Sequence, residues 1–116
     1  MMIKNLDAAE VACGLKEDSI LLIDVREPGE YAAERIQGAL LFPLSRFNPH
    51  ALPECGERTI VFQCASGMRS MNAIAACQRA GLPHHSHLRG GIQAWKAARL
   101  PTIAADPATG KPHHRG

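Results

Sequence analysis

The chain has 116 residues, of which 46% are hydrophobic and 21% are charged, proportions typical of one globular domain with a single modest core. A formal net charge of +2, with no basic run, argues against nucleic acid as a partner. No apolar stretch reaches the length of a membrane span and the amino end lacks a signal-peptide layout, so we expect a cytoplasmic protein with no membrane partner.

The first third of the chain predicts a helix, a buried strand and a second helix. Asp7 and Glu10 match a capping box, which begins a short helix that ends near Gly14. The apolar run over 19–25 has the length of a strand that is covered by helices on both sides. Pro28 lies in the first turn of the helix that we predict over 28–35.

Strands and helices continue to alternate towards the carboxyl end. We predict, in chain order, a strand over 39–43, a short helix over 45–52 interrupted at Pro49, a strand over 59–63, a helix over 70–80, a histidine-rich strand over 83–88 and a helix over 91–99. This alternation indicates an α/β fold in which a parallel sheet of about five strands carries helices on both faces. We therefore place one domain at residues 1–104, and we predict that the Pro- and Gly-rich tail over 105–116 is disordered.

Cys64 stands out because it follows an apolar, β-branched strand and precedes a helix. A thiol in that position faces the unpaired backbone N–H groups of the helix start. Those groups, the positive helix end and Arg69 all favour a negative charge, so we expect Cys64 to be a thiolate near neutral pH. Gly67 tolerates a positive φ, which lets the loop amides converge. The sequence thus predicts a nucleophile in an anion pocket, at the carboxyl end of a strand where such folds bind ligands.

The other three cysteines lack this setting. Cys13 and Cys77 lie on predicted helices among alanines and are expected in the core, whereas Cys55 lies in a predicted loop where nothing activates it. The chain contains no Cys-x-x-Cys pair, so we expect free thiols in place of a zinc site or a thioredoxin motif. A buried structural cysteine is the alternative interpretation of Cys64, and its loop context argues against it.

The spacing of the loop favours sulfur chemistry over phosphate chemistry. Four residues separate Cys64 from Arg69, whereas phosphatases that attack through cysteine use a loop one residue longer, wide enough for a phosphoryl group. The loop resembles the Cys-x-x-Gly-x-Arg loop of the rhodanese family of sulfurtransferases. Two further segments resemble signatures of that family: Ile23-Asp-Val-Arg-Glu-Pro-Gly-Glu-Tyr31 running on to Ile36-Gln-Gly-Ala39, and Leu88-Arg-Gly-Gly-Ile-Gln-Ala-Trp95. Together the three motifs span roughly residues 3 to 100, in the order of the family.

The resemblance implies a sulfurtransferase whose catalytic residue is Cys64. Its thiolate would attack the outer sulfur of a small anion such as thiosulfate, and the resulting persulfide would pass that sulfur to cyanide, a thiol or a protein acceptor. No metal and no organic cofactor is needed for this chemistry. The substrate-binding residues would be those of the loop, Ala65, Ser66, Gly67, Met68 and Arg69.

Several supporting roles remain open at this level. Ser66 could donate a hydrogen bond to a sulfur on Cys64 or could stabilise the turn. Arg69 could face the substrate or pair with Asp24 or Glu30. The resemblance implies that Asp24, Arg26 and Glu30 form a structural brace beneath the site. Gly90-Gly91 is expected to let the chain pass close to the active loop, with Trp95 in the core.

Three histidines in the strand predicted over 83–88 raise the question of a metal site. His85 and His87 would alternate onto one face of that strand, but no carboxylate or cysteine lies at a convincing ligand spacing. We therefore expect adventitious surface binding and no metal site.

Two other functions compete with sulfur transfer. A non-catalytic rhodanese-like module that binds a partner or senses redox state would typically have lost the cysteine that this chain keeps as Cys64. An arsenate reductase or phosphatase is disfavoured by the short loop.

Overall fold

The computed structural model describes residues 2–106 and 108–115 and is built around a parallel sheet. The strand order of this central sheet is β1 (Lys4–Leu6), β6 (Ser86–Leu88), β5 (Thr59–Gln63), β2 (Ile20–Asp24) and β4 (Leu40–Leu41). Each neighbouring pair is parallel. The predicted α/β fold with about five parallel strands is confirmed, and β5, which precedes Cys64, lies at the centre of the sheet.

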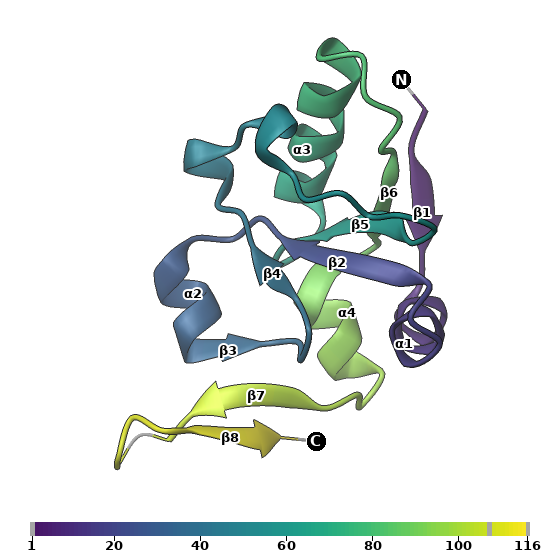
Figure 1. Ribbon diagram of the computed structural model, residues 1–116. Coiled ribbons are helices and arrows are strands. Elements are labelled where there is room, and N and C mark those ends of the chain that lie inside the picture. The colour runs from purple at the N-terminus through teal and green to yellow at the C-terminus, as the bar shows by residue number, and fades with distance from the viewer. Residues whose placement is uncertain (1, 107, 116) are drawn as a thin grey trace.

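Helices cover both faces of the central sheet, as Figure 1 shows. They are α1 (Ala8–Lys16), α2 (Pro28–Ala33), α3 (Met68–Arg79) and α4 (Gly91–Ala97). One core contains Val11 of α1 and Trp95 of α4, and the other contains Ile74 of α3. Strand β2 supplies Leu22 to the first core and Ile23 to the second. Its uninterrupted apolar run therefore follows from burial on both faces.

Helix α1 begins at the predicted capping box but extends beyond its predicted end. The Glu10 N–H donates to Asp7 Oδ1 at 2.8 Å, and the Asp7 N–H donates to Glu10 Oε1 at 3.1 Å. The helix runs to Lys16, past Gly14. A Cβ at Gly14 would lie 2.2 Å from Ile20 Cδ1, so this glycine allows the helix to pack closely on β2 and does not end it.

A second sheet of three strands lies beside the first, with the order β3 (Glu34–Arg35), β7 (Thr102–Ala105) and β8 (Pro112–Arg115). Both pairings are antiparallel. The helix predicted over 28–35 ends at Ala33 because the next two residues pair with β7. Figure 1 shows β7 and β8 on the far side of β3 and α4 from the central sheet.

The tail that we predicted to be disordered instead contains strand β8. Gly110 belongs to the connection between β7 and β8, and Pro112 is the first residue of β8. The Asp106 side chain accepts from the Ala108 N–H at 2.8 Å, Gly110 adopts φ +73°, and the Asp106 N–H donates to Lys111 O at 2.7 Å. Residues of these types are typical of turns between strands, and the described residues of the tail form a turn and a strand where we predicted disorder.

Two further predicted elements differ in form. The helix predicted over 45–52 appears as two short 3₁₀ helices, Leu44–Arg46 and Pro49–Ala51, separated before Pro49. The predicted histidine-rich strand is reduced to Ser86–Leu88, and it pairs with β1, which we did not predict. Within the described residues, no helix combines the length and apolar character needed to cross a bilayer.

Candidate active site

Cys64 lies at the carboxyl end of β5, in the short loop that leads into α3. Its Sγ accepts hydrogen bonds from the Gly67 N–H at 3.1 Å and the Ser70 N–H at 3.4 Å. Gly67 is the N-cap residue of α3, with φ +110°, and has no side chain that could cap the helix. The sulfur of Cys64 therefore takes the place of an N-cap oxygen, and the positive helix end faces it.

The rest of the loop surrounds the sulfur with backbone and leaves two side chains exposed. Cys64 is only 1% exposed, whereas Ser66 and Met68 project into solvent. The hydroxyl group that contacts the sulfur belongs to Ser70, whose Oγ lies 3.7 Å from Cys64 Sγ. Ser70 was not among the predicted site residues.

The start of α4 holds the outer side of the loop. The Ile92 N–H donates to Cys64 O at 2.8 Å, and the Gln93 N–H donates to Ala65 O at 3.1 Å. A Cβ at Gly91 would lie 2.2 Å from Cys64 O, so only glycine allows this approach. The expected close passage of Gly90-Gly91 is thus observed. These two hydrogen bonds direct the carbonyl oxygens of Cys64 and Ala65 towards α4. Oxygens held there do not place their partial negative charges against a negative charge on the sulfur.

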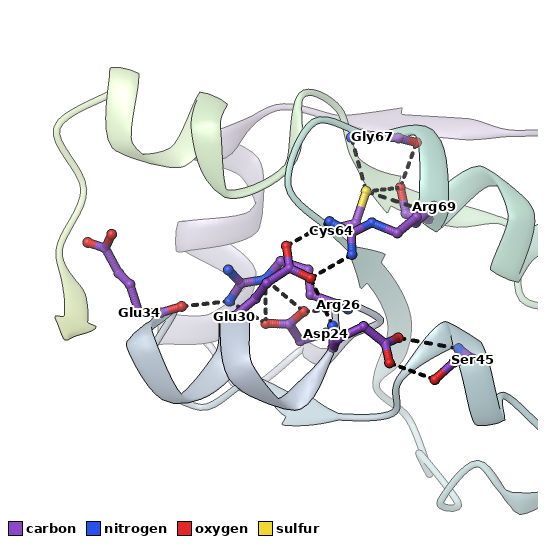
Figure 2. A network of polar contacts seen from close by, with 10 residues as sticks. Asp24, Arg26, Glu30, Glu34, Ser45, Cys64, Gly67 and Arg69 are labelled. Carbon is purple, nitrogen blue, oxygen red and sulfur yellow. Dashed lines mark hydrogen bonds and ion pairs between the residues drawn. The ribbon is translucent and has the colours of Figure 1, made fainter. Parts of the chain in front are cut away.

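Arg69 pairs with Glu30 of α2, one of the alternatives that the sequence left open. Arg69 Nη1 donates to Glu30 Oε1 at 2.7 Å and Nη2 donates to Oε2 at 2.9 Å, a bidentate pair visible in Figure 2. The guanidinium lowers the pKa of Glu30 to about 2. Glu30, and to a smaller extent the nearby Cys64, raise the pKa of Arg69. The charge of Arg69 therefore acts on the Cys64 region while its side chain holds α2 against the loop.

This pair predicts an acid-dependent loss of stability. The folded-state pKa of Glu30 lies below the ordinary value of about 4.3, so the pair stabilises the protein above that value and its contribution disappears as the pH falls to about 2. We expect Glu30→Gln to lower the free energy of unfolding at pH 7 by at most about 1 kcal/mol, because both side chains are partly exposed to screening solvent.

Urea unfolding between pH 7 and pH 2 measures this effect. The difference between wild type and Glu30→Gln should shrink below about pH 4, and Glu57→Gln, an exposed loop position, is the matched control. A difference that stayed constant down to pH 2 would contradict the role of the ion pair.

Asp24 and Arg26 form a second, buried pair that is separate from the first. Arg26 Nη2 donates to Asp24 Oδ2 at 2.8 Å and to Glu34 O at 2.7 Å. Figure 2 shows this pair beneath the Arg69–Glu30 pair. The brace implied by the resemblance is therefore two pairs, one of which joins the end of β2 to β3.

His87 is buried, contrary to our expectation of a surface histidine. It is 3% exposed, its Nδ1 lies 2.7 Å from Ser70 Oγ, and its Nε2 lies 2.7 Å from Asn5 Oδ1. Burial lowers the pKa of His87. We predicted that His85 and His87 share one face of a strand. The structure differs, because His85 lies before β6 and contacts Pro83 O. In the described part of the chain, no three His, Cys, Asp or Glu side chains are grouped as metal ligands would be.

The remaining cysteines differ from Cys64 in their surroundings. Cys77 is buried, which raises its pKa to about 11. Cys13 is exposed on α1, where we had expected it in the core, and its contact with Glu17 raises its pKa. Neither change favours a thiolate near neutral pH. Cys55 is partly buried.

Comparisons with known proteins agree with this geometry. The family model described as "Rhodanese-like domain" matches residues 7–98. An uncharacterized protein of Synechocystis sp. is 46% identical over 88 residues, which cover 76% of this chain and 49% of that protein. The chain thus spans about half the length of that relative. A protein of Allochromatium vinosum named "Sulfurtransferase" is 32% identical over 106 residues, which cover 90% of this chain and 99% of that protein.

A solved structure shows the same fold. The solution NMR structure of the rhodanese-like domain from the Anabaena protein Alr3790 has a TM-score of 0.76 at 27% identity. The match covers 99% of this chain and 89% of that one.

Proposed function

Because the chain belongs to the rhodanese-like domain family, we propose that it is a sulfurtransferase that carries sulfur as a persulfide on Cys64. The observation that supports this most directly is the Cys64 sulfur placed at the start of α3, where two backbone N–H groups donate to it. The same arrangement stabilises a thiolate before the reaction and a persulfide after it.

In the first half-reaction, the Cys64 thiolate attacks the outer sulfur of a donor such as thiosulfate. A sulfur–sulfur bond forms to Cys64, the sulfur–sulfur bond of thiosulfate breaks, and sulfite leaves with the electron pair. The loop residues 65–69 enclose the incoming anion, and Arg69, held by Glu30, adds positive charge near it.

In the second half-reaction, cyanide or a thiol attacks the outer sulfur of the persulfide and Cys64 leaves as a thiolate. The N–H groups of Gly67 and Ser70 stabilise the leaving sulfur as they stabilised the attacking one. A covalent intermediate between two substrates predicts ping-pong kinetics. Reduced thiols are abundant in the cytoplasm, where we propose that the protein acts without a metal or organic cofactor.

The retained cysteine and the loop length support this proposal over its rivals. A module that only binds partners has no need for a buried sulfur at a helix start. A phosphatase requires a ring wide enough for a phosphoryl group, and the loop from Cys64 to Arg69 is one residue shorter than such rings.

Intact mass spectrometry tests the proposal. After incubation with thiosulfate, the protein should gain the mass of one sulfur atom, and cyanide should remove it. The Cys55→Ser variant should behave identically, because Cys55 lies outside the loop. If wild type gained no sulfur but hydrolysed an aryl phosphate, the phosphatase interpretation would replace ours.

A further inference from the structure

A chain of hydrogen bonds runs from the Cys64 sulfur to the edge of the central sheet. Cys64 Sγ lies 3.7 Å from Ser70 Oγ, Ser70 Oγ lies 2.7 Å from His87 Nδ1, and His87 Nε2 lies 2.7 Å from Asn5 Oδ1. Cys64, Ser70 and His87 are buried, whereas Asn5 is exposed on β1. The mechanism proposed above uses the backbone of Ser70 and makes no use of its hydroxyl group or of His87.

The Ser70 hydroxyl group has one proton and three neighbours that can accept it. Gly67 O lies 3.0 Å from Ser70 Oγ, in addition to His87 Nδ1 and Cys64 Sγ. When one neighbour accepts the proton, the other two face only the lone pairs of the oxygen. A neutral His87 Nδ1 that accepts this proton withholds it from the sulfur, whereas a protonated His87 leaves only Gly67 O and the sulfur as acceptors.

We propose that His87, held by Asn5, is a positioning residue that directs the Ser70 hydroxyl proton and thereby controls the ionisation of Cys64. With Asn5 Oδ1 as acceptor, neutral His87 carries its proton on Nε2 and leaves Nδ1 bare. Nδ1 then accepts the Ser70 proton, and Ser70 Oγ can accept the S–H proton of a Cys64 thiol.

A second proton on His87 reverses this arrangement. Nδ1–H then donates to Ser70 Oγ, and Ser70 can turn its own proton towards the sulfur. The Cys64 thiolate gains a hydroxyl donor beside the two N–H groups that it already has. Protonation of His87 and ionisation of Cys64 consequently favour each other, and the two groups titrate as a coupled pair.

The side chains around His87 do not fix its protonation state. Asn5 faces it from β1, Ser70 from α3, and its register partner on β5 is Phe62, all uncharged. Burial and the charge of Arg89 lower the pKa of His87, which favours the neutral form at pH 7. The negative charge of a Cys64 thiolate acts in the opposite direction and favours protonated His87. His87, Arg89 and Asn5 also line a hollow at the surface, through which protons can exchange with solvent.

A carboxylate in place of the Asn5 amide provides the test. Asn5→Asp puts a negative charge beside His87 Nε2 at an exposed position, which favours the imidazolium form. Alkylation of Cys64 by iodoacetamide is followed against pH in a background where Cys13 and Cys55 are serine. We expect Asn5→Asp to move the midpoint of this profile down by about one pH unit.

The matched control removes the titrating ring. In a His87→Asn background, whose amide can still contact Ser70 but does not titrate, Asn5→Asp should leave the midpoint in place. An equal shift in both backgrounds, or no shift with His87 present, would overturn the proposal. Thermal unfolding of each variant checks that the fold is retained.

A second measurement keeps the test decisive if His87→Asn does not fold. Alkylation of wild-type Cys64 converts the sulfur to an uncharged thioether, so NMR titration of the His87 ring should show a lower pKa after alkylation than before. An unchanged His87 titration would overturn the proposal. The role of this coupling in turnover rests on the proposed function, but alkylation needs no sulfur donor. A protein that failed to take sulfur from thiosulfate would therefore refute the proposed function and leave these results standing.

Discussion

Replacing Cys64 with serine should abolish transfer of sulfur from thiosulfate to cyanide and leave the fold intact. Serine cannot form the persulfide. In a serine protease, loss of the covalent nucleophile lowers turnover by on the order of 10⁶. The fold should persist because a serine Oγ can accept the N–H groups of Gly67 and Ser70 that now donate to sulfur. The measurements are cyanide-dependent turnover and thermal unfolding.

Cys55→Ser is the matched control, because Cys55 is partly buried and lies outside the loop. It should retain turnover close to that of wild type. Substantial turnover in Cys64→Ser that then depended on Cys55 would refute the assignment of the nucleophile.

Gly91→Ala should damage both stability and turnover. Gly91 adopts φ +59°, and a Cβ there would lie 2.2 Å from Cys64 O and 2.7 Å from Ala65 C. Backbone atoms cannot turn away as a flexible side chain can, so the loop and α4 must separate. We expect a loss of roughly 3 kcal/mol in the free energy of unfolding. Because a displacement of about 1 Å at a reacting group costs about 10²-fold in rate, turnover should fall by at least that factor.

Gly38→Ala separates the effect of a positive φ from the effect of a close approach to the loop backbone. Gly38 also has a positive φ, +89°, but a Cβ there would meet nothing within 4 Å. It should cost about 1 kcal/mol from backbone strain and leave turnover unchanged. Urea unfolding and steady-state kinetics compare the two variants. Equal costs, with turnover retained in both, would show that the close approach of Gly91 to the loop is unimportant.

The part of the fold that could be predicted from sequence is the part determined by local patterns. Strands β2 and β5 are buried on both faces, so each is an apolar run of recognisable length. Strand β1 has three residues with one buried, and β3 has only two residues. These elements exist because distant strands pair with them, and a short window of sequence contains no sign of such pairing.

The site divides in the same way. The position of Cys64 between a strand and a helix start follows from neighbouring residues, so this position could be predicted. The contact between Ser70 and His87 spans 17 positions and that between His87 and Asn5 spans 82. Only the sheet order, which places β6 between β1 and β5, brings these residues together. Which carboxylate pairs with Arg69 likewise depends on where α2 packs, and in the structure it is Glu30.

The second sheet extends the folded unit beyond the segment that defines the family. The family model ends at residue 98, yet Trp95 Nε1 donates to Pro101 O at 2.8 Å and β3 finds its partner strand in β7. The Arg26 side chain that braces the end of β2 also donates to Glu34 O, within β3. A chain shortened to the family boundary would leave the Trp95 indole without this acceptor and β3 without a neighbour. We therefore expect a chain shortened to residue 98 to unfold at a lower temperature than one that extends through β7.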